Sequence, residues 1–283
     1  MKKGAKSTIK DYAEFWRKLP AEIKPTPFAL AFWEAKIKIL IKQNSQLRAL
    51  VLGATPEIRD LLAKYNIKTV CLDINPLMTK AMGLLVRKKN PKEKIVIGSW
   101  LRMPFEKESF DLVIADCPQD NLPFAKWPAF FNNIYRVLKP DGYWFLGTIF
   151  FIGFQEGITL DQFIKIYRRN PKIFKNQSWK FYYALKLTCN PEFYNSKQKI
   201  GDWIKLDKKI FRLYEKKQIT GQEFKNMNLF TNKLGQSLAC RFTWITKNEF
   251  YNFLKKHHFS IFGHKQDKKL PADCFRWAFI LKK

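Results

Sequence analysis

The chain has 283 residues, of which 46% are hydrophobic and 16% aromatic, so it can bury a large core. Its formal charge is +28, from 52 Lys and Arg against 24 Asp and Glu. A field of this sign attracts polyanions such as RNA, although the excess of lysine over arginine favours a genome-wide compositional bias as its origin. The five cysteines are scattered and never spaced as CxxC, which excludes a disulfide framework and predicts no metal site.

The ends and the apolar stretches of the chain bear on its location. The N-terminus leads into charged residues, and the longest apolar stretch, around Tyr143–Phe154, is too short to cross a bilayer. We therefore expect a cytoplasmic protein with reduced thiols and no stable membrane insertion.

The first predicted elements are two helices. One covers 9–18, and the second starts at Pro27, with Thr26 as its N-cap. From residue 48 onward, apolar strands alternate with helices. The sequence predicts strands at 49–52, 69–73, 94–97, 110–115 and 143–151, and helices at 56–64, around 77–85 and at about 124–138. Nearly continuous apolar strands between helices indicate a parallel sheet that is covered on both faces.

The alternation breaks over 157–243, a basic and aromatic segment. Its apolar residues recur at helical spacing, which predicts a helical insertion: Ile200, Trp203, Ile204, Ile210, Phe211 and Tyr214. After it, Thr246 and Glu249 form a capping-box pattern before another helix. The runs 259–262 and 275–281 then predict two strands that pair antiparallel.

These elements divide the chain into four parts. They are N-terminal helices at 1–46, an α/β core at 47–151, the insertion at 152–243, and a helix with strands that complete the core at 244–283.

The turn at Gly53 and the carboxylate of Asp73 form the most informative pair. Gly53 ends the first strand of the α/β core, and Thr55 and Pro56 open the following helix. Asp73 ends the second strand, twenty residues after Gly53. This layout is typical of a nucleotide-type site in an open α/β sheet, but a single glycine is too few for close approach to a pyrophosphate, which tells against a dinucleotide.

Several motifs together carry a resemblance to a known family. They are Val51-Leu-Gly-Ala-Thr-Pro-Glu57, Asp73-Ile-Asn75, Gly98-Ser-Trp-Leu-Arg-Met-Pro-Phe105, Ser109-Phe-Asp-Leu-Val-Ile-Ala-Asp116 and Tyr135-Arg-Val-Leu-Lys-Pro-Asp-Gly142. In this order and spacing they resemble the class I S-adenosylmethionine-dependent methyltransferases. The resemblance implies a Rossmann-like, doubly wound sheet of seven strands, the last one antiparallel, with S-adenosylmethionine as cofactor.

The resemblance also implies roles for individual residues. The cofactor-binding set is Gly53, Ala54, Thr55, Asp73, Ile74, Ser99, Trp100 and Asp116. Asp73 is expected to bind the ribose hydroxyls, and Trp100 to flank the adenine. Asp116 is also the candidate catalytic residue. Tyr12 and Trp16 are candidate substrate-site residues that could close over the cofactor. Val51 and Ser99 stand where the family usually has acidic residues.

Each role has a structural alternative. Asp73 could be the N-cap of the next helix, Trp100 could be a core residue, and Tyr12 and Trp16 could only pack their helix. The function favoured is methyl transfer to an unidentified acceptor, with a small molecule preferred. The alternatives are a catalytically silent cofactor-binding or partner protein, and an RNA-binding protein or RNA methyltransferase that uses the basic insertion.

Overall fold

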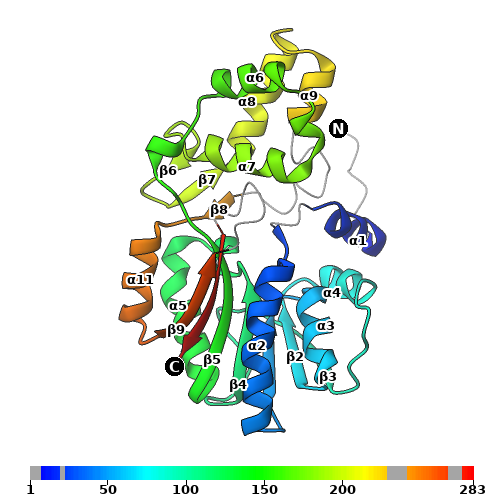
Figure 1. The fold of residues 1–283 in the computed structure, drawn as a ribbon, viewed down its shortest axis with the longest axis vertical. Coiled ribbons are helices and arrows are strands. Elements are labelled where there is room, and N and C mark those ends of the chain that lie inside the picture. The colour runs from blue at the N-terminus through cyan, green and yellow to red at the C-terminus, as the bar shows by residue number, and fades with distance from the viewer. Residues whose placement is uncertain (1–7, 20–22, 228–240, 267–275) are drawn as a thin grey trace.

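A seven-stranded sheet organises the chain (Figure 1). The structure is a computed structural model and describes residues 8–19, 23–227, 241–266 and 276–283. The strands of the sheet are β1 (Arg48–Leu52), β2 (Lys68–Asp73), β3 (Glu93–Ile97), β4 (Phe110–Asp116), β5 (Leu138–Ile149), β9 (Ser260–Gln266) and β10 (Arg276–Lys282). Their spatial order is β3-β2-β1-β4-β5-β10-β9.

The strand directions agree with the predicted fold. Strands β1 to β5 pair in parallel, and β10 pairs antiparallel with both β5 and β9. The Lys-Pro-Asp-Gly turn at 139–142 bulges out of β5. Phe110 pairs with Leu138 and Leu112 pairs with Tyr143, so the residues of the turn have no partners on β4. The seven-stranded sheet with an antiparallel last strand is therefore confirmed. Phe275, the expected start of that strand, lies outside the described residues.

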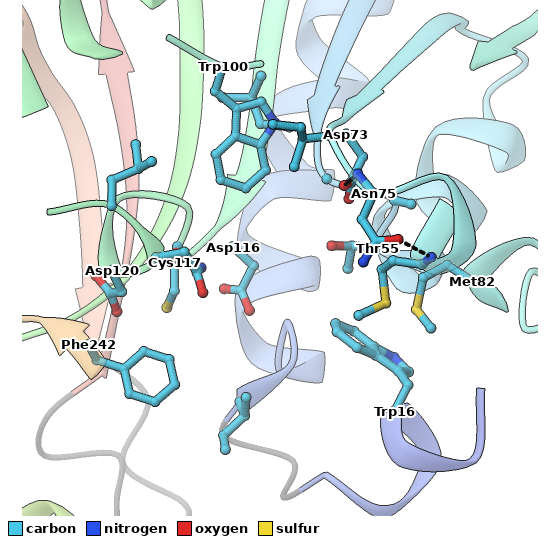
Figure 2. A pocket seen from close by; sticks show the side chains of 18 of the residues that line it. Trp16, Thr55, Asp73, Asn75, Met82, Trp100, Asp116, Cys117, Asp120 and Phe242 are labelled. Carbon is cyan, nitrogen blue, oxygen red and sulfur yellow. Dashed lines mark hydrogen bonds between the residues drawn. The ribbon is translucent and has the colours of Figure 1, made fainter. Parts of the chain in front are cut away.

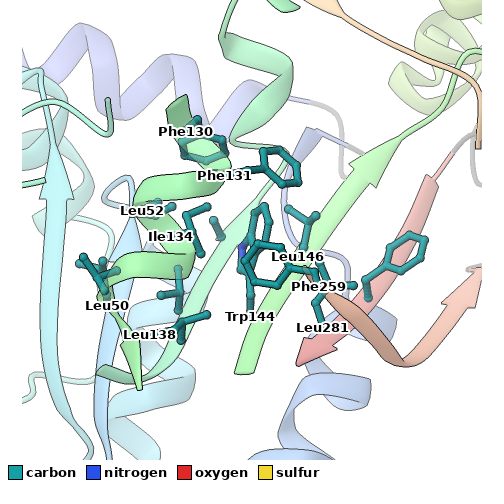
Figure 3. Close-up of a cluster of buried hydrophobic side chains, with 14 of the residues drawn as sticks. Leu50, Leu52, Phe130, Phe131, Ile134, Leu138, Trp144, Leu146, Phe259 and Leu281 are labelled. Atoms are coloured by element: carbon teal, nitrogen blue, oxygen red, sulfur yellow. The ribbon is translucent and has the colours of Figure 1, made fainter. Parts of the chain in front are cut away.

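Alternate residues of the central strands β1, β4 and β5 pack into two separate cores. Leu50 and Leu52 pack with α5 (Trp127–Val137) and α11 (Lys247–Lys256) around the buried Phe131 (Figure 3). Ala49 and Val51 point to the other face and pack with α2 (Pro27–Gln43) and α3 (Pro56–Lys64). The period of two along each strand thus produces the three-layer arrangement.

Helix starts follow local capping chemistry. Thr26 caps α2 by accepting a hydrogen bond from the Ala29 amide, and Thr246 and Glu249 form the predicted capping box on α11. Helix α1 (Ile9–Lys18) has the predicted bounds and packs against α4 (Pro76–Gly83). In the described part of the chain, no helix combines the length and apolarity needed to cross a membrane.

The insertion lies over the carboxyl edge of the parallel strands (Figure 1). Its helices are α6 (Leu160–Arg169), α7 (Gln177–Thr188), α8 (Trp203–Glu215) and α9 (Gly221–Met227). It also contains a three-stranded antiparallel sheet formed by β6 (Tyr194–Asn195), β7 (Ile200–Asp202) and β8 (Arg241–Thr243).

The prediction of a purely helical insertion was therefore wrong at Ile200. That residue lies in β7, and α8 begins only at Trp203. The reason is tertiary. Gly201 approaches the ring of Trp244 so closely that an added Cβ would lie 3.0 Å from it, and the strand pairs with β6 and β8 on either side.

Candidate functional site

One cavity of about 540 Å³ opens at the carboxyl edge of the sheet, between the ends of β1, β2 and β4 and the insertion. In Figure 2, Asp73 and Asn75 lie on one side of it, Asp120 and Phe242 on the opposite side, and Asp116 between them. Its volume lies within the range of roughly 300–1,000 Å³ that is usual for small-molecule sites. Nine of the ten residues proposed from the sequence line it, and only Tyr12 does not.

The β1–α3 turn forms the first part of the wall. Gly53 has φ +93°, a conformation that side-chain-bearing residues rarely adopt, and its amide donates to the Leu72 carbonyl at 2.9 Å. Thr55 occupies the N-cap position of α3, but its hydroxyl makes no capping hydrogen bond. Ala54 and Thr55 are both buried against the cavity. The turn therefore presents a small side chain, a hydroxyl and a helix N-terminus to the cavity, which suits an anionic group.

Asp73 is held in place without serving as a helix cap. Its Oδ1 accepts from the Asn75 amide at 2.8 Å, and Asn75 itself caps α4 by accepting from the amides of Leu77 and Met78. The N-cap alternative for Asp73 was therefore wrong. Burial raises the pKa of the Asp73 carboxyl group, while hydrogen bonds from backbone amides oppose that rise.

The loop after β3 supplies a fixed aromatic wall. Trp100 donates its indole N–H to the Leu72 carbonyl at 2.8 Å, so its ring is oriented beside the cavity, and it also packs on the core. The hydroxyl of Ser99 accepts from the Leu101 amide at 3.2 Å. Ile74 lies at the rim and is 71% exposed.

Asp116 forms an ion pair that the sequence did not indicate. Its carboxylate pairs with the guanidinium of Arg276 from β10, 160 positions away, and the two side chains are only 4% and 3% exposed. Burial lowers the pKa of Arg276, but the charge of Asp116 and its hydrogen bond to the guanidinium outweigh burial and raise the pKa overall. A Cβ at Gly147 would overlap Asp116 Oδ1, so this glycine makes room for the pair.

Asp120 is a second carboxyl group that the sequence did not single out. It lies in the 3₁₀ turn η2 (Gln119–Asn121), is 2% exposed and lines the cavity. Gln119 Nε2 donates to Asp120 Oδ1 at 2.9 Å and to Thr148 Oγ1 at 2.7 Å. Burial, and next the charge of Asp116, raise the pKa of Asp120 well above its usual value.

Neither Arg276 nor Asp120 belongs to a motif. The sequence feature that could have pointed to Arg276 is its place as a lone basic residue near the start of an apolar strand. For Asp120 the corresponding feature is its position four residues after Asp116.

Helix α1 closes one side of the cavity. Phe15, Trp16 and Leu19 line it, and Trp16 donates its indole N–H to Glu57 Oε1 at 3.2 Å. Tyr12 lies one turn earlier and is buried against α4, in a cluster with Ala81 and Met82. Tyr12 therefore has the structural role that was its alternative.

A comparison with known families gives the domain its class. Residues 52–142 match a family described as a methyltransferase domain. The chain carries a methyltransferase domain. The matched residues include the Gly53 turn, Asp73, Trp100 and Asp116, so this domain holds most of the cavity wall. This match agrees with the resemblance of the sequence motifs to class I S-adenosylmethionine-dependent methyltransferases.

A curated relative supports the same domain. An uncharacterized methyltransferase-like protein from Schizosaccharomyces pombe is 32% identical over 116 residues, which cover 41% of this chain and 42% of that protein. The aligned region thus spans less than half the length of that relative.

Solved structures share the fold over nearly the whole chain. The PH0226 protein of Pyrococcus horikoshii OT3 is 14% identical, with a TM-score of 0.53, and the match covers 95% of this chain and 98% of that one. The 1,6-didemethyltoxoflavin-N1-methyltransferase of Burkholderia thailandensis, solved with bound 1,6-didemethyltoxoflavin and S-adenosylhomocysteine, is 11% identical. Its TM-score is 0.51, and the match covers 96% of this chain and 82% of that one. A Rhodobacter sphaeroides protein described as a putative Zn-dependent alcohol dehydrogenase is 10% identical with a TM-score of 0.57 and coverage of 98% and 100%. At these identities the likeness shows the fold alone.

The residues of the methyltransferase domain fit the cofactor. Asp73 offers a carboxylate at the end of β2 for a vicinal diol, and the single-glycine turn leaves the α3 N-terminus facing the cavity. Trp100 offers a ring face for the base. Asp116, in contrast, already neutralises a buried guanidinium.

Proposed function

We propose that this chain is an S-adenosylmethionine-dependent methyltransferase that acts on a small-molecule acceptor. The observation that carries the proposal is the single cavity shared by two groups of residues. Gly53, Asp73 and Trp100 lie at its cofactor side, and an aromatic wall from the insertion lies across from them. A cofactor and an acceptor can therefore meet inside one cavity that the protein screens from water.

S-adenosylmethionine, when bound here, would supply a methyl group on positively charged sulfur for direct transfer to a lone pair of the acceptor. The protein has to hold the acceptor in line and keep water out. In our proposal Asp73 accepts hydrogen bonds from the ribose hydroxyls of the cofactor. Thr55 and the N-terminus of α3 bind the carboxylate of its methionine part. Ile74, Ser99 and Trp100 surround its adenine. Asp116 is a positioning residue, because its ion pair with Arg276 fixes the end of β4 beside the reaction centre.

We also propose that different segments of the chain bind the cofactor and the acceptor. Residues 47–151 and 244–283 form the core that holds the cofactor. The N-terminal helices at 1–46 and the insertion at 152–243 enclose the acceptor, and Trp16 covers the cofactor side. This division is supported by the origin of the cavity wall, because Phe181 and Phe242 come from the insertion and Phe15 and Trp16 from α1.

An RNA substrate receives no such support. None of the similar proteins named above is described as acting on RNA. The described residues that line the cavity include no Lys or Arg, although the whole chain carries +28.

The test is calorimetric titration of the protein with S-adenosylhomocysteine. We expect saturable binding, and we expect Asp73→Ala to weaken it more than tenfold, since hydrogen bonds to a charged group are worth about 1.5–3 kcal/mol each. Asp161→Asn, on the exposed first turn of α6, is the matched control and leaves the affinity unchanged.

Absence of binding to the wild-type protein would refute the proposal. Binding without methyl transfer from labelled cofactor to any small-molecule pool would instead favour the silent cofactor-binding alternative.

A further inference from the structure

The side of the cavity that faces away from Asp73 has a mainly aromatic and aliphatic wall. Its apolar lining residues are Leu122, Ile149, Phe181, Phe242 and Trp244. The rings of Phe242 and Trp244 are parallel, with an interplanar angle of 1° and centroids 5.8 Å apart. Such flat aromatic surfaces favour a planar apolar ligand.

Asp120 is the polar group within this wall. In Figure 2 its carboxyl group lies beside the ring of Phe242, on the far side of Asp116 from Asp73. The hydrogen bond from Gln119, which is itself fully buried and anchored on Thr148, fixes the orientation of the carboxyl group. Because each carboxyl oxygen has two acceptor positions, Asp120 can accept a further hydrogen bond from a ligand.

The charge of the lining is acidic. Three carboxyl groups line the cavity, those of Asp73, Asp116 and Asp120, and no described lining residue is Lys or Arg. Asp116 holds the guanidinium of Arg276, whose charge also reaches Asp120. An anionic ligand therefore finds no further cation among the described lining residues, whereas a hydrogen-bond donor finds the acceptor oxygens of Asp120. The lining differs in this respect from the chain as a whole, whose charge is +28.

The volume limits the size of the acceptor. About 540 Å³ must hold the cofactor and the acceptor together, whereas a pocket of this size usually holds one drug-sized ligand. The acceptor is therefore a small molecule of one or two rings, and a nucleotide chain or a phosphorylated metabolite is a poor match in both size and charge.

We propose that this half of the cavity binds a small, planar, nitrogen-containing acceptor that lacks an anionic group, with its N–H hydrogen-bonded to Asp120 and its ring against Phe242. The inference rests on the proposed function and adds the substrate class to it. Asp120 is then the residue that selects the acceptor.

The test measures probe binding to the complex with S-adenosylhomocysteine, so that cofactor binding is established first. The probes are quinolin-4-amine, quinoline-4-carboxylate and naphthalene, which share a bicyclic plane and differ in the polar group. We expect the amine to bind at least tenfold more tightly than the carboxylate. A preference for the carboxylate, or no binding of the amine, overturns the inference while leaving cofactor binding, and hence the proposed function, intact. A complex that never forms with S-adenosylhomocysteine refutes the proposed function instead.

Two variants test whether Asp120 is responsible for the preference for the amine probe. Asp120→Asn keeps the size of the side chain. We expect it to weaken the binding of quinolin-4-amine at least tenfold and to change the binding of naphthalene little. Phe242→Leu is expected to weaken both probes alike, because it removes ring contact and no charge. Equal affinity of the amine for wild-type protein and a folded Asp120→Asn variant contradicts the assignment. The probe comparison on wild-type protein stays decisive if that variant does not fold.

Discussion

Loss of the guanidinium of Arg276 is expected to destabilise the protein far more than loss of an ordinary surface cation. The side chains of Arg276 and Asp116 are 3% and 4% exposed, so Arg276→Met leaves a carboxylate buried without its cation. Breaking a buried pair in this way typically costs about 3–5 kcal/mol, against about 0–1 kcal/mol for an exposed pair. For a domain of 150–250 residues, about 2–4 °C per kcal/mol converts this loss into a fall in Tm of about 6 °C or more.

The assay is urea unfolding followed by tryptophan fluorescence and far-ultraviolet circular dichroism. The matched control is Lys282→Met, on the same strand, because Lys282 pairs with an Asp141 side chain that is 82% exposed. We expect the control to leave the unfolding midpoint unchanged. The double variant Asp116→Leu/Arg276→Met should recover most of the loss, since removing both charges avoids an unpaired one.

A loss below about 1 kcal/mol for Arg276→Met would refute this reasoning, because it would mean that water or another cation reaches Asp116 in the folded protein. A double variant no more stable than Arg276→Met would locate the cost in packing rather than in the unpaired charge.

Three further predictions concern the same region and its core. Gly147→Ala should lower the free energy of unfolding by about 1–3 kcal/mol, because its Cβ would overlap Asp116 Oδ1. Gly83→Ala, with nothing within 4 Å of the added Cβ, should cause no loss, and equal urea midpoints for the two variants would contradict this. Asp120→Asn should gain stability relative to wild type as pH rises, because burial raises the folded pKa of Asp120. The stability that protonated Asp120 contributes is fully present below the unfolded pKa, near about 4, and is lost as pH rises through the folded pKa. A difference in unfolding free energy between variant and wild type that stays constant as pH rises from about 4 would contradict this. Phe131→Ala should cost about 3–5 kcal/mol in the same assay, since the ring is fully buried, and a loss of less than about 1 kcal/mol would show that the core can close around the gap.

The fold was largely predictable because its signals are local. Neighbouring side chains of β1 point to opposite cores, Leu50 and Leu52 to one and Ala49 and Val51 to the other. Because both sets are apolar, the sequence predicts a strand that is buried on both faces. Pro27, preceded by Thr26, marks the start of α2 at the residue observed. These signals depend on a few neighbouring residues, so they survive without knowledge of the rest of the chain.

The cofactor side of the site was predictable for a related reason. In a parallel sheet the carboxyl ends of neighbouring strands meet at one edge, so Gly53, Asp73 and Asp116 had to lie close together once their strands were assigned. Tyr12 was misplaced because helical spacing alone does not say which turn of α1 reaches the cavity and which reaches α4.

The insertion exceeded what local signals can decide. Ile200 fits a helical period with Trp203 and Ile204, yet it pairs as a strand, because the stability of β7 comes from partners at positions 194–195 and 241–243. Strand pairing of this kind depends on distant segments that periodicity does not reveal.

The doubly wound sheet, its helix caps and the carboxylates along its binding edge can be read from the order of the residues, because propensity, periodicity and capping act between near neighbours. The electrostatics of the cavity depends instead on contacts between distant parts of the chain. The folded chain pairs Asp116 with Arg276 across 160 positions, leaves room at Gly147 for that pair, and buries Asp120 in an aromatic wall where the charge of Arg276 also reaches it. The energy of a charge depends on its burial and on its partners in space, and neither is written in the order of the residues.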